Sequence, residues 1–208
     1  MIALLDYGAG NLTSVRKALS AIGADVRTPV VAAELAEVRG IIVPGVGHFA
    51  ATRALSDEWR VAIQSALDRG AALFGICLGM QWLFEGSTEA PGVRGFCAFL
   101  GVCSHLSDAG TQKPGIDPTP LRKIPHVGWN SLAISRATGL MADVAPDAQV
   151  YFTHSYVAPV TEVAVATTSY GVTFASAVEQ GRIAGVQFHP EKSSDVGLRI
   201  LGNWLRAV

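Results

Sequence analysis

The segment 71–84, AALFGICLGMQWLF, joins a strand-like run to a helix-like run with almost no loop between them. Residues 71–76 have the apolar bulk and the length of a buried strand, and the residues after Cys77 can wind as a helix. Gly75 and Gly79 flank Cys77 at two-residue spacing. A sharp strand-to-helix turn needs glycines there, because side chains would collide with the neighbouring backbone. The segment therefore predicts a turn that lifts Cys77 clear of a sheet.

The position of Cys77 at the start of the expected helix bears on its chemistry. Free N–H groups and the helix dipole favour an anion there, and the thiolate is the reactive form of cysteine. The Gly-x-Cys-x-Gly pattern thus predicts a nucleophile elbow with sulfur in place of oxygen. A buried structural cysteine between two packing glycines is the alternative, since free cysteine is among the most buried residue types. The pattern alone leaves both interpretations open.

The N-terminal half alternates strand-like and helix-like segments. Strands are expected at residues 2–5, 24–28 and 40–43, and helices at residues 12–22, 32–38 and 55–67. This alternation predicts an α/β fold with a mostly parallel central sheet flanked by helices on both faces. Ligands bind at the carboxyl ends of the strands in such folds.

The C-terminal half is rich in Thr, Val, Tyr and Phe, which favour strands. Strands are expected at residues 92–102, 121–134, 149–157, 163–168, 172–178 and 182–188. The dipeptides at 170–171 and 180–181 predict hairpin turns, which add antiparallel strands in this half. A last helix is expected from about residue 193. No linker or internal repeat interrupts the chain, so residues 1–208 are expected to form one domain.

The expected strand at 40–43 runs into a tight loop, Pro44-Gly45-Val46-Gly47. Its two glycines permit unusual dihedral angles, so its N–H groups can converge on an oxyanion. An ordinary strand-to-helix turn is the commoner meaning of a Pro-Gly pair and stays open. If the strands at 40–43 and 71–76 are neighbours, this loop lies beside Cys77.

A nucleophilic cysteine needs a proton acceptor that a third group holds in place. His189 directly follows the apolar run 183–188 and so stands at a strand end, like Cys77. Glu191 lies two residues further on, close enough to hold one ring nitrogen while the other faces the sulfur. These residues reproduce the roles of a catalytic triad. A surface histidine beside a helix-start glutamate is the alternative, because short motifs alone are weak indicators.

Composition excludes several classes of partner. Charged residues make up 16% of the chain and the formal net charge is −1, with no run of Lys or Arg, so neither nucleic acid nor a membrane surface is an expected partner. Three cysteines are too few for a disulfide framework, which indicates a reducing cytoplasm. Cys97 and Cys103 lack elbow glycines and are expected to be small core residues. Neither a signal peptide nor a membrane span is expected.

The strings PGVG, GICLGMQ and FHPE, in this order and at these separations, resemble the class I (triad) glutamine amidotransferase domain. Longer strings resemble the glutaminase subunits of imidazole glycerol phosphate synthases. These are DYGAGNL at 6–12, PGVG at 44–47, GICLGMQ at 75–81, EGS at 85–87, PHVGWN at 125–130, YFTHSY at 151–156 and QFHPEKS at 187–193. The resemblance implies a flavodoxin-like α/β fold and spans nearly the whole chain.

The resemblance implies a role for each matching residue. Cys77 is expected to attack the side-chain amide carbon of L-glutamine, His189 to protonate the departing ammonia and then activate water, and Glu191 to orient His189. The implied oxyanion and substrate-binding residues are Val46, Gly47, Leu78, Gln81, His154, Ser155 and Tyr156. No metal or other cofactor is implied.

The resemblance also implies a partner. In this family ammonia passes to a separate (β/α)₈-barrel cyclase subunit, which makes imidazole glycerol phosphate and an aminoimidazole carboxamide ribotide in histidine biosynthesis. A heterodimer is therefore expected. The positions that match partner-facing strings are Asn11, His126, Trp129 and Lys192.

Two features depart from the family pattern. His48 stands where the family usually has a small residue, and the Cys103–Lys123 segment is longer and richer in proline than expected. Residues 104–120 within it are expected to be a flexible excursion. Two other functions stay open: an amidotransferase that feeds a different synthase, and a non-catalytic binding subunit with the same fold. The presence of Cys77, His189 and Glu191 together argues against the second.

Overall fold

The computed structural model describes residues 1–109 and 123–208. Within these ranges the main sheet has eight strands in the order β2-β1-β3-β4-β13-β12-β11-β8. They are β1 (Ile2–Leu4), β2 (Val26–Arg27), β3 (Gly40–Val43), β4 (Ala72–Ile76), β8 (Ala133–Ile134), β11 (Ala164–Tyr170), β12 (Val172–Gln180) and β13 (Ile183–Val186). Strands β2 to β13 in this order are parallel, and the pairs from β13 to β8 are antiparallel. The predicted mixed sheet and both predicted hairpins are confirmed.

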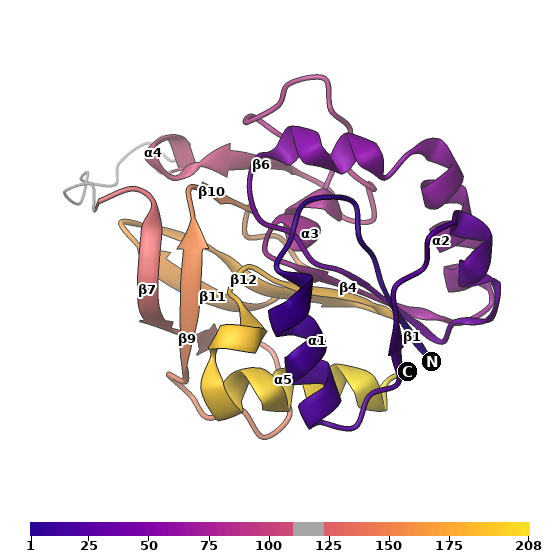
Figure 1. Cartoon of the computed structure of the whole chain (residues 1–208). Helices are drawn as coiled ribbons and strands as arrows, with labels where there is room; N and C mark the ends of the chain where they lie inside the picture. Colours follow the sequence, from indigo (N-terminus) through magenta and orange to yellow (C-terminus); the bar gives the residue numbers. More distant parts are fainter. Residues whose placement is uncertain (110–122) are drawn as a thin grey trace.

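Helices cover both faces of this sheet (Figure 1). Helices α1 (Leu12–Ala21) and α5 (Ser194–Arg206) pack on one face, and η1 (Ala32–Glu37), α2 (Asp57–Asp68) and α3 (Leu78–Trp82) on the other. Successive strand residues divide between the faces: Ile2 and Leu4 join the core under α1 and α5, whereas Ala3 joins the core under α2. Because both faces are buried, these strands appear in the sequence as continuous apolar runs.

Two smaller sheets stand beside the main sheet (Figure 1). Strands β7 (His126–Ser131) and β9 (Gln149–His154) form an antiparallel ribbon. Strands β5 (Gly86–Ser87), β6 (Val102–His105) and β10 (Tyr156–Val157) form the other sheet. The short helices are η2 (Phe49–Ala54), α4 (Leu106–Ala109) and η3 (Pro190–Lys192). The excursion expected at 104–120 lies largely outside the described residues, and its first part forms the end of β6 and α4.

The prediction of a strand at residues 92–102 is wrong, because only Val102 of this range lies in a strand. The N–H groups of Gly95, Phe96, Cys97 and Phe99 instead donate to the carbonyls of Glu85, Trp82, Phe84 and Leu83. An α-helix leaves its last carbonyls unpaired. The carbonyls that accept these N–H groups belong to Trp82, the last residue of α3, and to the residues that directly follow it. The segment therefore caps this helix, and these N–H groups are not available for a strand ladder.

The two cysteines outside the elbow differ from each other. Cys103 is fully buried, as predicted, and burial raises the pKa of its thiol. Cys97 is not the core residue that was predicted, because it is partly exposed. Its backbone has φ 64°, and Arg94 Nε donates a hydrogen bond to its sulfur at 3.2 Å. The tight turn that caps α3 holds Cys97 at the surface.

Candidate active site

Cys77 connects β4 to α3 through a strained turn. Its backbone has φ 52° and ψ −105°, which is unusual for a residue with a side chain. A Cβ on Gly75 would lie 2.6 Å from the backbone of Gly79, and a Cβ on Gly79 would lie 1.8 Å from the carbonyl oxygen of Val43. Both glycines are therefore required where β3, β4 and α3 meet. The chain forms the predicted elbow.

Strand β13 brings His189 to the same end of the sheet as Cys77. It pairs in parallel with β4, with Val186 opposite Ile76, so the residues that follow the two strands leave the sheet side by side. The N–H of Cys77 donates to the Val186 carbonyl at 2.8 Å and joins the two strand ends. Residues from distant parts of the sequence thus meet at one edge.

His189 and Glu191 form a buried pair. Glu191 Oε1 lies 2.8 Å from His189 Nδ1, and each side chain is 2% exposed. The other ring nitrogen, Nε2, is buried and has no hydrogen-bond partner among the described residues. Burial alone lowers the pKa of His189, but interactions with Cys77 and Glu191 outweigh burial and raise the pKa to about 10. The pair therefore favours a protonated ring beside the sulfur.

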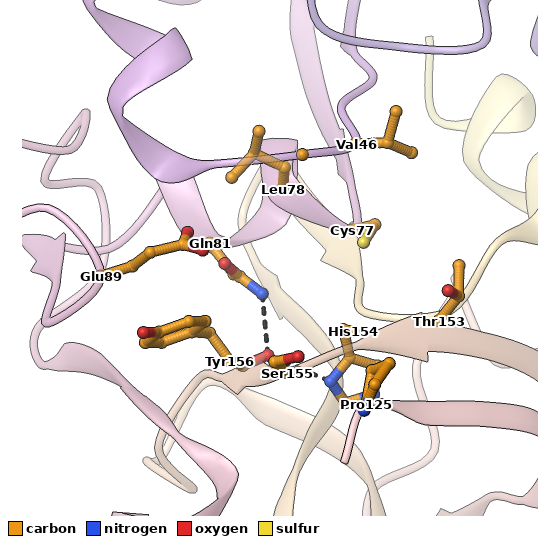
Figure 2. A pocket seen from close by; sticks show the side chains of 11 residues that line it. Val46, Cys77, Leu78, Gln81, Glu89, Pro125, Thr153, His154, Ser155 and Tyr156 are labelled. Carbon is orange, nitrogen blue, oxygen red and sulfur yellow. Dashed lines mark hydrogen bonds between the residues drawn. The ribbon is translucent and has the colours of Figure 1, made fainter.

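The sulfur of Cys77 opens into a cavity of about 250 Å³ (Figure 2). Its lining residues are Val46, Gly47, Cys77, Leu78, Gln81, Glu89, Pro125, Thr153, His154, Ser155 and Tyr156. All the residues predicted to bind the oxyanion or the substrate belong to this set. The cavity is smaller than those that hold drug-sized ligands, typically about 300 Å³ or more, and suits a ligand of amino-acid size.

Gln81 and Glu89 supply polar groups to the cavity (Figure 2). Gln81 Nε2 donates to the Tyr156 carbonyl at 2.9 Å and to Gln187 Oε1 at 3.0 Å, which leaves its own Oε1 for a ligand. Glu89 Oε2 accepts the N–H of Phe49 at 2.7 Å. The sequence interpretation missed Glu89, because an isolated loop glutamate carries no local signal. Only the folded chain brings it to the cavity.

His154 forms a neutral part of the cavity wall. Its Nδ1 lies 3.0 Å from the Tyr156 carbonyl, which can only accept, so Nδ1 carries the proton. Its Nε2 lies 3.2 Å from His126 Nδ1 and therefore accepts a hydrogen bond. Burial, and then the neighbouring His126, lowers the pKa of His154 to about 3. Both ring nitrogens are thus occupied by protein groups.

The loop after β3 lies beside Cys77, because β3 and β4 are parallel neighbours, which is the condition that the sequence interpretation set for this placement. The N–H of Leu78 donates to the Gly45 carbonyl at 3.3 Å. The carbonyl and the N–H of one trans peptide point in opposite directions, so the Val46 N–H points away from the Leu78 N–H. Gly47 has φ 101°, a conformation that glycine adopts readily. The loop here presents a carbonyl, and not a second donor, to Leu78.

Two of the residues predicted to face a partner lie around Tyr151 on the β7–β9 ribbon. Trp129 on β7 is 52% exposed, and its ring centre lies 6.0 Å from that of Tyr151. Lys192 Nζ lies 5.7 Å from the centre of the Tyr151 ring. An exposed tryptophan, a tyrosine and a cation therefore share one surface.

Asn11, His48 and His126 are held by local contacts. Asn11 caps α1 by accepting the N–H of Ser14, and His48 accepts a backbone N–H at the start of η2. His126 was predicted to face a partner, but its side chain is 2% exposed, with its ring centre 3.9 Å from that of Tyr170. Any part that His126 takes in docking is therefore indirect.

Neither a metal site nor a membrane-spanning helix is found in residues 1–109 and 123–208. No group of three His, Cys, Asp or Glu side chains in these ranges has an arrangement that could hold a metal ion. No helix in the same part of the chain is long and apolar enough to cross a bilayer.

The chain belongs to the class-I glutamine amidotransferases, and its fold is the one that this family has. The family model described as "Glutamine amidotransferase class-I" matches residues 3–207. A solved structure described as "Crystal structure of glutamine amidotransferase" superposes with a TM-score of 0.73 over 99% of this chain and 97% of its own. Its sequence is 16% identical, so this likeness concerns the fold alone.

Curated relatives narrow the family further. The "Imidazole glycerol phosphate synthase subunit HisH" of Deinococcus radiodurans is 41% identical and is matched over 99% of this chain and 93% of its own. The subunit of the same name from Methanothermobacter thermautotrophicus is 37% identical, over 100% of this chain and 99% of its own. The chain belongs to the HisH family of class-I glutamine amidotransferases.

Proposed function

We propose that this chain is the glutaminase subunit of imidazole glycerol phosphate synthase, which hydrolyses L-glutamine to glutamate and ammonia. One observation carries the proposal: Cys77 stands on a strained elbow at a cavity of amino-acid size, with the buried His189–Glu191 pair at the same sheet edge. A structural cysteine needs neither a strained backbone nor an oriented base. The relatives named HisH support the same activity.

The chemistry follows from the three side chains. The Cys77 thiolate attacks the amide carbon of glutamine, and the amide oxygen takes the negative charge. His189 then gives its Nε2 proton to the amide nitrogen, and the C–N bond breaks. Ammonia departs, and the acyl group remains on the sulfur as a thioester. Water attacks the thioester while His189 accepts its proton, and glutamate leaves. Glu191 holds the ring in one orientation and stabilises its charged form.

The far part of the cavity fits the amino-acid end of glutamine. The Glu89 carboxylate and the free Gln81 Oε1 are acceptors that match an α-ammonium group. Ser155 and Tyr156 line the same cavity. A substrate held at its amino-acid end places its amide carbon at the sulfur, which is the positioning that the chemical step requires.

The ammonia is proposed to pass to a (β/α)₈-barrel cyclase subunit in a heterodimer for histidine biosynthesis. The exposed Trp129, with Tyr151 and Lys192, supports a docking surface on the β7–β9 ribbon. We infer that residues 1–208 act as one domain, because the main sheet combines strands from both ends of the chain. The free cysteines fit a reducing compartment such as the cytoplasm.

The test is glutamate release in the presence of the cyclase subunit. The Cys77→Ala variant is expected to release none, whereas Cys97→Ala, the same change outside the cavity, is expected to keep the wild-type rate. Supplying ammonium chloride to the Cys77→Ala mixture should restore the cyclase product, which shows that the cyclase subunit itself still works. Wild-type glutamate release by Cys77→Ala would refute the proposal.

A further inference from the structure

The side chain of Gln187 reaches the sulfur of Cys77 from within the core. Gln187 is 0% exposed, and its Nε2 lies 3.6 Å from Cys77 Sγ. Its Oε1 accepts a hydrogen bond of 3.0 Å from Gln81 Nε2. The backbone N–H of Gln187 donates to the carbonyl of Ser176 on β12 at 2.9 Å. This bond fixes the backbone from which the Gln187 side chain extends. A buried amide thus touches the atom that reacts.

The direction of this amide is set by its neighbours. Gln81 Nε2 also faces the Tyr156 carbonyl, which can only accept, so this atom of Gln81 is a nitrogen. Gln187 must then present its oxygen to Gln81 and its NH₂ group to the sulfur. The chain of contacts runs from the cavity wall at Tyr156, through two amides, to the nucleophile.

We propose that Gln187 is a positioning residue that donates a hydrogen bond to the Cys77 thiolate and stabilises it at the attacking position. The proposal rests on the proposed function of Cys77 as the nucleophile. A donor to a charged acceptor is worth more than the same donor to a neutral one, so the Gln187 amide favours thiolate over thiol.

Other titratable groups around this sulfur and its cavity come from different elements. His189, backed by Glu191, favours the thiolate from the side of η3. Tyr7, in the loop after β1, has its pKa raised by burial and by the charge of Cys77, and it stays neutral. His154 on β9 is neutral and Glu89 lies in the same cavity. Gln187 differs from these side chains because it is an uncharged donor with a hydrogen-bonding contact to the sulfur.

The experiment measures the rate at which iodoacetamide alkylates Cys77 as a function of pH, in the full chain, by mass spectrometry of the Cys77 peptide. The Gln187→Met variant keeps the length of the side chain and removes the donor. We expect its alkylation midpoint to rise by about one pH unit, a tenfold loss of thiolate below the midpoint. The Gln187→Glu variant places a carboxylate at the sulfur and should raise the midpoint further.

Two controls accompany these variants. Gln149→Met makes the same change at an exposed position on β9, and the Cys97 peptide reports on a second thiol in every sample. Neither the Cys77 midpoint in Gln149→Met nor the Cys97 midpoint in any variant should move. Thermal melting shows whether each variant is folded. If Gln187→Met does not fold, the side-chain amide resonance of Gln187 in the wild type takes its place, and it should shift with the ionisation of Cys77.

An unchanged Cys77 midpoint in a folded Gln187→Met variant overturns the proposal, as does a Gln187 resonance that is insensitive to Cys77 ionisation. Alkylation needs no glutamine and no partner. A failure of the glutaminase assignment, seen as activity in Cys77→Ala, is therefore distinguishable from a failure of the role given to Gln187.

Discussion

The carbonyl of Tyr151 accepts a hydrogen bond of 2.9 Å from the backbone N–H of His189. The N–H of Tyr151 in turn donates to Ser193 Oγ at 2.9 Å, and this hydroxyl donates to the His189 carbonyl at 2.6 Å. Ser193 precedes α5 but its side chain makes no capping bond to that helix, because it serves β9 instead. One residue of β9 thus holds both sides of the segment that carries the imidazole, while its ring belongs to the exposed aromatic surface.

The Trp129 ring lies against the Tyr151 ring, so a substitution of Trp129 tests whether this surface binds the cyclase subunit. Truncation of Trp129 to Ala is expected to weaken binding of the cyclase subunit by about 2 kcal/mol, roughly 30-fold, because exposed aromatic residues dominate such interfaces. Titration calorimetry measures the change. Val61→Ala, at a 68% exposed residue on α2, far from β7 in Figure 1, is the control and should bind normally. Equal affinities for both variants would place the partner elsewhere.

Glu191 offers a test of the ion pair. The Glu191→Gln variant keeps the size of the side chain but loses the charge that stabilises a protonated ring, and its amide can favour the wrong ring tautomer. Glutaminase kcat in the complex is expected to fall by roughly 10²- to 10⁴-fold, with little change in KM. Asp195→Asn, a matched change at an exposed acid on α5, should leave kcat unchanged. A full rate in Glu191→Gln would remove Glu191 from the mechanism.

The raised pKa of His189 makes a prediction for stability. The folded-state pKa of about 10 exceeds the ordinary value of 6.5, so the stabilisation is fully present below about pH 6.5 and is lost as the pH rises through about 10. Urea unfolding of the wild type and of His189→Gln should therefore show a difference that shrinks across this window. Removing the sulfur with Cys77→Ala should lower the His189 pKa in an NMR titration. A difference that grows with pH would contradict the stabilising role of the charged ring.

Features marked by a local pattern, or by residues to which the family resemblance assigned a role, were predictable from the sequence, whereas other contacts between distant segments were not. The elbow at Cys77 was visible because two glycines flank the cysteine at two-residue spacing, although the crowding that selects Gly79 comes from Val43 on the neighbouring strand. The turn that caps α3 was mistaken for a strand because its partners are carbonyls of another segment. Glu89 and Gln187 were missed for the same reason: each becomes functional only through a contact with a residue far along the chain, Phe49 for one and Cys77 for the other.

The glycines of the elbow give a prediction with an internal control. Gly79→Ala would place a methyl group 1.8 Å from the Val43 carbonyl oxygen, so we expect a loss of about 3 kcal/mol or more in the free energy of unfolding. Gly202→Ala on α5 meets no atom within 4 Å and should stabilise the protein by about 0.5–1 kcal/mol, because glycine is unfavourable inside a helix. Urea denaturation compares the two. A Gly79→Ala protein as stable as the wild type would mean that the elbow has room for a methyl group.

The hydrogen bond from Leu78 to the Gly45 carbonyl predicts that the partner controls the rate. While this bond persists, the Leu78 N–H is occupied and the Val46 N–H points away, so the negative oxygen of the tetrahedral intermediate lacks its donors. Rotation of the Gly45–Val46 peptide frees the first donor and turns the second inward, and glycine makes this rotation inexpensive. If docking favours the rotated loop, the cyclase subunit should raise glutaminase kcat by about 10²-fold or more, the usual effect of one oxyanion donor. Iodoacetamide alkylation of Cys77 builds no oxyanion, so its rate should not follow that increase. Equal turnover by the free and the bound subunit would show that the donors are already in place, and an equal rise in both rates would assign the control to the thiolate instead of the loop.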